Sequence, residues 1–323
     1  MPRIARLKIK GESAVYHVVS RTALDGFVIG DIEKEFLVNL IKRLSRVYFS
    51  EVLGFCLMGN HFHLLVRMHS GEDYSDEEIK TRFMNYYGSD KGGKKIELRE
   101  GQIPFFRNKW EDLSEYIREI KQGFSRFYNR RHNRRGFFWS ERFKSVIVDN
   151  GETLINCLAY IDLNPVRAGI VEKPEEYRWS SLGYHVQAKN KDKFLSLDFG
   201  LREFGVKKTA ERSRYYRKFM YEKGGINIRN QISEINRRRQ GAMAGQGSQQ
   251  KKNQGEDYEI KAIDRFRYRT RYFTDSGIIG SKAFVDRIYQ QFKENFTSKH
   301  EKKPKIIHGL EGVYSLKRLS EVI

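Results

Sequence analysis

The chain reads Gly59-Asn60-His61-Phe62-His63-Leu64-Leu65-Val66 in the segment from which the rest of its architecture can be worked out. A second apolar run, residues 52–58, precedes this segment, and a Gly-Asn pair between two apolar runs is typical of a tight hairpin turn. We therefore predict two adjacent antiparallel strands. Side chains i and i+2 of a strand point to the same face, so His61 and His63 project side by side, with Cα atoms about 7 Å apart.

Two neutral imidazoles on one face of a strand can bind a single divalent cation. The alternative is a pair of buried histidines, each bonded to its own carbonyl or carboxylate, and the need for two separate partners makes this less favoured. His17 and His69 lack such a neighbour and are interpreted as structural. Metal ligands must be neutral and an unperturbed imidazole has a pKa of about 6.5, so we expect a metal-dependent activity here to fall in mild acid.

Composition favours a nucleic-acid-binding protein. The 323 residues carry a net charge of +20 and are 39% hydrophobic, so a packed core and a polyanionic partner are both expected. An anionic membrane is the second choice, which the lack of a long apolar run or a signal peptide disfavours. Cys56 and Cys157 lie in apolar runs and are interpreted as buried thiols, which suits a reducing cytoplasm.

Hydrophobic periodicity predicts an α+β fold. The expected elements are a strand at 14–22, a helix at 32–49, the two strands around His61, helices at 73–87 and 113–132, an extended segment at 137–148 and a helix at 151–163. Their order matches the ferredoxin-like arrangement, an antiparallel sheet with helices on one face. Ser75 is a candidate N-cap, and residues 88–104 are expected to form an inserted loop or hairpin.

The composition changes after about residue 185, which suggests four segments. We expect a core at 1–185, a basic helical extension at 186–240, a flexible Gly-, Gln- and Ser-rich linker at 241–257, and a small C-terminal unit at 258–323.

The middle of the chain is strongly basic. Between residues 118 and 144 nine bases face two acids; the bases are Arg118, Lys121, Arg126, Arg130, Arg131, Arg134, Arg135, Arg142 and Lys144. Seven aromatic residues are interleaved: Phe124, Phe127, Tyr128, Phe137, Phe138, Trp139 and Phe143. Cations that contact phosphates and rings that stack on unpaired bases together favour single-strand DNA binding. The alternative is a solvated helix face above core aromatics. A second basic stretch, Arg237–Arg239, is a candidate DNA-binding arm.

The predicted helix at 151–163 carries a second candidate site. If helical turns reach Asn164, this residue lies one turn beyond Tyr160 on nearly the same face. A phenol can act as a nucleophile, and an amide oxygen is a suitable ligand for Mg²⁺ or Mn²⁺. Most helical tyrosines only pack, so this pattern alone indicates little.

The motifs taken together resemble the single-tyrosine HUH transposases, and more narrowly the transposases associated with repetitive extragenic palindromes. The matching segments are Tyr16-His17-Val18 with Ser20-Arg21, residues 56–65, Tyr128-Asn129-Arg130-Arg131, residues 136–139 with 142–145, residues 160–169, and Pro174 with Tyr177, Trp179, Ser180 and Ser181. They extend over about residues 14–184. The family usually has Pro where Gly59 stands.

This resemblance implies a nuclease core in which His61, His63 and Asn164 bind Mg²⁺ or Mn²⁺ and Tyr160 is the nucleophile. It also implies cleavage and rejoining of single-stranded or hairpin DNA through a 5′-phosphotyrosine, a homodimer, and a place near the nucleoid. Two alternatives remain open: a hairpin-binding protein that has lost catalysis, and a metallophosphoesterase in which water attacks.

Overall fold

The computed structural model describes residues 6–88, 98–199, 201, 205–223, 272–296, 301–307, 310 and 312–317. The predicted linker at 241–257 and the basic stretch Arg237–Arg239 lie outside these residues, as does much of the inserted segment at 88–104.

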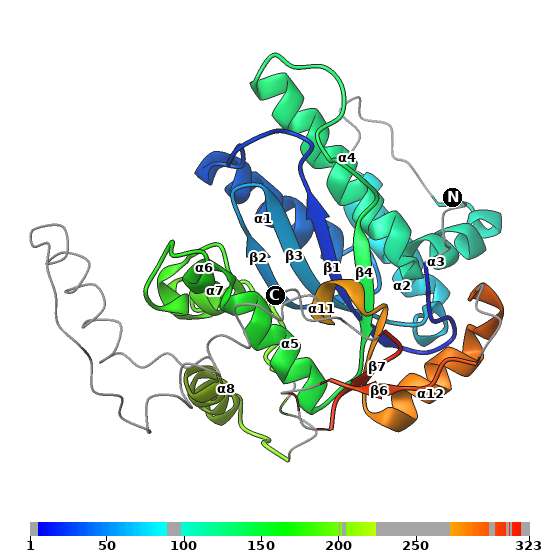
Figure 1. The fold of residues 1–323 in the computed structure, drawn as a ribbon. Helices are drawn as coiled ribbons and strands as arrows, with labels where there is room; N and C mark the ends of the chain where they lie inside the picture. The colour runs from blue at the N-terminus through cyan, green and yellow to red at the C-terminus, as the bar shows by residue number, and fades with distance from the viewer. Residues whose placement is uncertain are drawn as a thin grey trace, which may run out of the picture.

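The core is a four-stranded antiparallel sheet with the order β2-β3-β1-β4 (Figure 1). Its strands are β1 (Ala14–Arg21), β2 (Ser50–Leu57), β3 (His61–Met68) and β4 (Lys144–Val148). Helix α1 (Asp31–Ser45) connects β1 to β2, and α4 (Leu113–Arg131) precedes β4. This strand order and connectivity confirm the predicted ferredoxin-like α+β fold.

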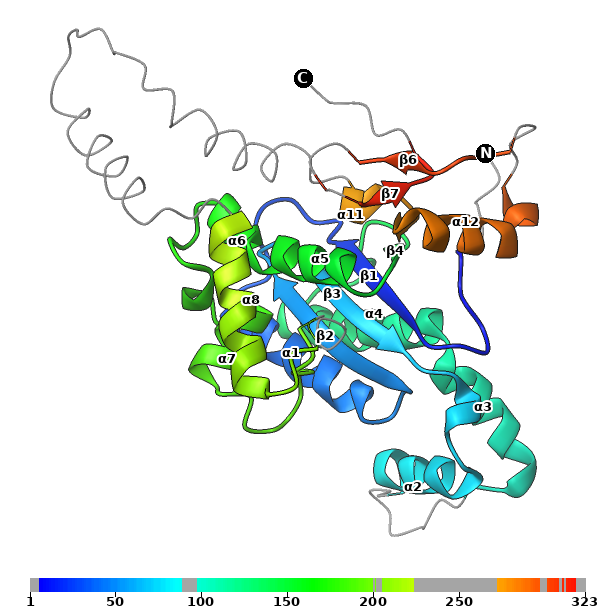
Figure 2. The same cartoon turned by 90° about the horizontal axis from the view of Figure 1, so that it is seen from below.

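Helices cover both faces of this sheet rather than one (Figure 2). Phe62 of β3 contacts Trp139, which packs against Phe124 of α4, whereas the next residue, His63, faces Tyr160 of α5 (Glu152–Asp162). Successive strand residues point to opposite faces, so α4 and α5 lie on opposite sides of the sheet. The physical reason is that the central strands bury apolar residues on both faces and therefore need two covers.

The remaining helices of the core agree with the sequence in part. Helix α2 (Asp76–Tyr87) begins after Ser75, whose hydroxyl accepts from the Glu78 amide, so the predicted N-cap is confirmed. Helix α3 (Ile103–Glu111) was not predicted, because Pro104 and the preceding Gly- and Lys-rich run suggested a loop. A short α6 (Asn164–Arg167) follows α5 and α7 (Ser181–Gln187) comes next. Helix α8 (Thr209–Lys223) lies within the basic helical extension expected at 186–240.

The C-terminal residues extend the same sheet. After α11 (Tyr272–Asp275), β5 (Ile278–Gly280) pairs in parallel with β4, and β7 (Tyr314–Ser315) and β6 (Lys305–Ile306) follow to give seven strands. Helix α12 (Lys282–Gln291) packs beside β5. The core expected at 1–185 and the C-terminal unit expected at 258–323 thus contribute strands to one sheet. Within the described residues, no helix has the length and hydropathy to cross a lipid bilayer.

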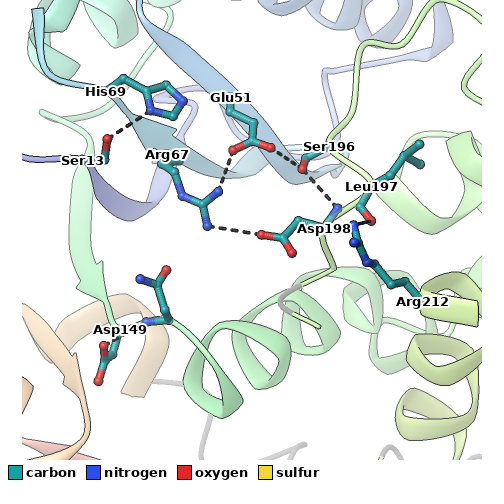
Figure 3. A network of polar contacts seen from close by, with 10 residues as sticks. Ser13, Glu51, Arg67, His69, Asp149, Ser196, Leu197, Asp198 and Arg212 are labelled. Carbon is teal, nitrogen blue, oxygen red and sulfur yellow. Dashed lines mark hydrogen bonds and ion pairs between the residues drawn. The ribbon is translucent and has the colours of Figure 1, made fainter. Parts of the chain in front are cut away.

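A polar network fastens the segment after α7 to the β2–β3 edge (Figure 3). Arg67 of β3 bonds Glu51 of β2 at 2.7 Å and Asp198 at 3.4 Å. Ser196 donates to the Glu51 carboxylate and accepts from the Asp198 amide. Arg212 of α8 reaches the Leu197 carbonyl, so α8 is tied to the same network.

The end of α5 is held by a buried carboxylate. Asp162 is fully buried and accepts from the Ser181 hydroxyl at 2.7 Å, the Leu182 amide at 3.0 Å and the Tyr216 hydroxyl of α8 at 2.6 Å. Burial raises the pKa of Asp162 from 3.8 to about 6 against the effect of these donors. This carboxylate therefore joins α5, α7 and α8.

Asp162 predicts a specific pH dependence of stability. Its pKa is higher in the folded state, so between about pH 4 and 6 the folded chain keeps a proton that the unfolded chain loses. The free energy of unfolding therefore falls as the pH rises through this window, and Asp162 contributes about 3 kcal/mol to this fall. Urea unfolding at several pH values should show that wild type loses stability relative to Asp162→Asn as pH rises. Asp25→Asn, at an exposed position, is the control; a pH-independent difference for Asp162→Asn would contradict the assignment.

Candidate functional site

The Gly59-Asn60 turn places two histidines at the start of β3. The Met58 amide donates to the His61 carbonyl at 2.8 Å, which closes the predicted two-residue turn. A Cβ at position 59 would lie 2.7 Å from the Cβ of Phe27, so glycine lets Phe27 pack over the turn. The His61 and His63 rings lie with their centroids 5.1 Å apart, which confirms that they project to one face.

A third histidine joins this pair. In the register of β1 against β3, Val19 pairs with His63 and His17 with Leu65, so His17 faces the same side as His63. His17 Nε2 lies 3.0 Å from His63 Nδ1, and His17 Nδ1 lies 2.6 Å from the Phe273 carbonyl oxygen of α11. The interpretation of His17 as merely structural was therefore incomplete, because it contacts a candidate ligand directly.

These bonds assign the proton positions on the histidines. A carbonyl oxygen only accepts, so His17 Nδ1 carries a proton, and in the neutral ring His17 Nε2 then accepts from His63 Nδ1. His61 Nδ1 lies 2.7 Å from the Asn60 side-chain oxygen and donates to it. The Nε2 atoms of His61 and His63 are thus the unprotonated nitrogens, the form that binds a metal ion.

Burial keeps all three rings neutral. It lowers the pKa of His17 to about 4, and burial together with the Arg21 charge lowers the pKa of His61 to about 4. The pKa of His63 is lowered well below its usual value by burial and then by His17 and His61. The expectation that activity falls in mild acid assumed an unperturbed imidazole pKa, and the pKa of each of these rings is lower than that.

Tyr160 of α5 lies against the histidines. Its ring centroid is 5.8 Å from that of His63, 5.9 Å from that of His17 and 5.3 Å from that of Phe273. The Arg167 guanidinium lies 4.2 Å from the Tyr160 ring centroid and donates to the Tyr160 carbonyl at 3.0 Å. A nucleophile candidate, neutral imidazoles and a half-buried cation therefore meet on the α5 face of the sheet.

Asn164 is less free to bind a metal than the histidines are. Its side-chain oxygen accepts from Arg167 at 2.8 Å, and its amide nitrogen donates to the Tyr160 and Ile161 carbonyls. The neighbouring guanidinium repels a second cation at this oxygen. No group of three or more His, Cys, Asp or Glu side chains suited to a metal occurs among the residues that the structure describes. His61 and His63 thus fit a metal as a pair, and Asn164 fits only if its oxygen accepts a second partner.

Comparison with known proteins agrees with the motifs. A REP-associated tyrosine transposase of Haemophilus influenzae is 25% identical over 172 residues, which are 50% of this chain and 80% of that protein. The resemblance to the REP-associated tyrosine transposases is confirmed. A solved structure described as a REP-associated tyrosine transposase bound to a REP hairpin is 17% identical, with a TM-score of 0.39 over 58% of this chain and 87% of that one. No family model matches the chain.

Three residues that contact the candidate site were not among the site residues predicted from the sequence. His17 could have been found from strand alternation, because it points away from Tyr16 and Val18. Arg167 lies seven residues after Tyr160, two helical turns on, so helical spacing was the available signal. Phe273 is 256 residues from its partner His17, and no local pattern indicates that contact.

In the basic segment expected to contact DNA, six cations bond to other protein groups and three more are exposed. Arg131 pairs with buried Glu33, Arg118 with Glu115, and Lys144 with Asp275. Lys121 donates to the Glu141 carbonyl, Arg126 to the Gln122 carbonyl and Arg134 to the Asn129 side chain. Arg130, Arg135 and Arg142 are exposed.

Of the seven interleaved aromatic residues, only Phe137 is exposed. Five are buried, and Phe127 stacks on Phe36 with ring centroids 3.8 Å apart. For six of the seven rings, packing therefore explains their presence.

Proposed function

We propose that this chain is a metal-dependent transposase that cleaves and rejoins single-stranded, hairpin-forming DNA through a 5′-phosphotyrosine. The observation that carries the proposal is the Tyr160 ring, 5.8 Å from the ring of His63 within one chain. The transposase name of the H. influenzae relative supports it, as does the +20 net charge. REP hairpin binding is described for a similar protein, and we extend hairpin DNA to this chain as its substrate class.

The ion would be Mg²⁺ or Mn²⁺, held by the Nε2 atoms of His61 and His63, with Asn164 as a weaker third ligand. When bound, it polarises a non-bridging oxygen of the scissile phosphate. The half-buried Arg167 and the exposed Arg21 add positive charge around the same face, which suits a phosphate substrate.

Tyr160 supplies the covalent chemistry. Its hydroxyl oxygen forms a bond to phosphorus while the bond from phosphorus to the 3′ oxygen breaks; the phenol loses its proton and the leaving 3′ oxygen gains one. A later attack by another 3′-hydroxyl breaks the tyrosine–phosphorus bond and rejoins DNA. The phosphotyrosine conserves the phosphodiester bond energy, so no ATP is needed.

Tyr160 and the histidine pair lie together in one chain, which supports a site formed within one subunit. A homodimer remains an expectation from the resemblance. A hairpin-binding protein without catalysis and a water-using phosphoesterase both lack a covalent intermediate, so detection of an adduct separates them from the transposase proposal.

We predict that Tyr160→Phe abolishes the covalent adduct and leaves DNA affinity within about twofold, because only the nucleophilic oxygen is lost. Hairpin DNA with single-stranded flanks is incubated with Mn²⁺ and the protein and resolved on a denaturing gel. A 5′-phosphotyrosine retains the downstream fragment, so a 3′ label should migrate with wild-type protein and a 5′ label should not. Tyr215→Phe, at an exposed position on α8, is the control. An adduct in Tyr160→Phe would assign the nucleophile to another tyrosine.

We predict that His61→Ala and His63→Ala each weaken Mn²⁺ binding at least tenfold and abolish cleavage, because each removes one of two nitrogen ligands. Calorimetric titration of the full chain with Mn²⁺ measures this without DNA. His69→Ala is the matched control, since His69 lies beyond the other end of β3 and bonds Ser13. Equal Mn²⁺ affinity in all three variants would exclude the histidine pair as the metal site.

His17 is predicted to position His63. His17→Phe removes the acceptor for His63 Nδ1 and should weaken Mn²⁺ binding about 10- to 100-fold. His17→Gln can still donate to the Phe273 carbonyl and accept from His63, so it should recover much of the affinity. If His17→Phe and His17→Gln bind Mn²⁺ with equal affinity, the hydrogen bond between His17 and His63 does not orient His63. This conclusion holds even if the two variants differ in stability.

A further inference from the structure

A groove runs between α4 and the segment that leads into β4. It measures about 730 Å³ and is lined by side chains of α4 between Ser114 and Arg126, by residues 136–139 and 141–143, and by Arg6. This size is within the usual range of ligand sites. Sequence patterns did not indicate that Arg6, from the first described residues, would join the basic segment.

Phe137 is an unusual component of this groove. Its side chain is 88% exposed, whereas Phe138, Trp139 and Phe143 beside it are buried. Exposing a whole aromatic ring forgoes the stabilisation that burial provides, so the ring is available for a ligand. Unpaired nucleobases stack on such rings, and this stacking tolerates any base.

The cations of the groove repel one another. Burial, and then the charge of Arg142, lowers the pKa of Arg6 to about 10; burial, and then the charge of Arg6, lowers the pKa of Lys121 to about 8. The Arg6 guanidinium lies 3.6 Å from the Phe143 ring centroid, which holds it in place. Two acids also line the groove: Glu115, which pairs with Arg118, and the exposed Glu141. Half-buried cations with this mutual repulsion are stabilised by a bound anion.

The groove lies on the α4 side of the sheet, at the same end of β1 and β3 that carries the candidate active site on its other face. Thr22, directly after β1, bridges to Trp139, and the Ser140 amide donates to the Arg21 carbonyl at 3.0 Å. Arg21 in turn pairs with His61 across β1 and β3. A DNA strand that leaves the groove at Phe137 therefore reaches the end of the sheet that carries His61.

We propose that this groove binds an unpaired nucleotide of the DNA substrate, with its base stacked on Phe137 and its phosphate held by Arg6, Lys121 and Arg142. The inference rests on the proposed function, because it assumes a DNA substrate. An acidic peptide would also satisfy the cations but would not need the exposed ring, so nucleic acid is the occupant that accounts for both features.

The test measures binding of full-length protein to a hairpin whose single-stranded flank carries 2-aminopurine, without metal so that cleavage does not interfere. Phe137→Ala should lose about tenfold in affinity and should no longer quench the 2-aminopurine at one flank position. Phe105→Ala, at a 64% exposed ring on α3 outside the groove, should match wild type. Both rings are exposed, so neither variant is expected to unfold, and circular dichroism verifies this.

A salt titration tests the phosphate contacts. Arg142→Gln should reduce the slope of log affinity against log salt by about 0.7, whereas Lys80→Gln, on α2, should leave it unchanged. The groove proposal is overturned if Phe137→Ala binds and quenches like Phe105→Ala, or if it weakens blunt duplex and flanked hairpin equally. If either of these outcomes is found while the wild-type protein still forms the covalent adduct, the groove proposal fails and the proposed function stands. If wild type binds no form of DNA, the proposed function fails with it.

Discussion

The pairing of β1 with β3 controls the geometry of the candidate site. Its register sets Val19 opposite His63 and Arg21 opposite His61, which turns His17, His61 and His63 to the face covered by α5. A slip of one residue would turn one strand's histidines toward α4, where Phe62 and Trp139 pack. Both faces of the sheet are buried, so a slip by an odd number of residues would place polar rings in an apolar layer. The same apolar packing that stabilises the sheet therefore orients the imidazoles.

Burial also determines the chemical state of these imidazoles. Below α5 the rings of His17 and His63 are buried, and the cations Arg21 and Arg167 act on His63. Both effects oppose protonation, so the histidines remain available as ligands. The same cations favour the approach of a phosphate. A site that is short of acids is thus suited to an anionic substrate.

The C-terminal segment takes part in this site. Strand β5 adds to the edge of β4, and the α11 segment before it carries Phe273 to His17 and Tyr160. The Phe273 carbonyl determines which nitrogen of His17 carries the proton, and through it the proton position on His63. Residues far apart in the chain therefore act on one ring through two consecutive hydrogen bonds, and the core would lack this contact without its C-terminal part.

Local signals in the sequence were enough to predict several of the helices and strands. Alternating apolar residues and the Gly59-Asn60 turn predicted β2 and β3 and placed His61 beside His63, because a strand has a period of two and a two-residue turn sets the register. Helical spacing predicted α1, α4 and α5, and the order of elements predicted the ferredoxin-like sheet. Motif order was sufficient to indicate the resemblance to REP-associated transposases.

The contacts between residues of different elements could not be predicted in this way and became known from the three-dimensional fold. It placed α5 on the opposite face from α4, joined His17 and Phe273 to the histidine pair, and engaged the Asn164 oxygen with Arg167. It also separated Phe137 from six other aromatic residues of similar sequence context, since periodicity reports which side of a helix is apolar but not what covers a loop. These outcomes depend on contacts between segments up to 256 residues apart, for which neither local propensity nor spacing carries a signal.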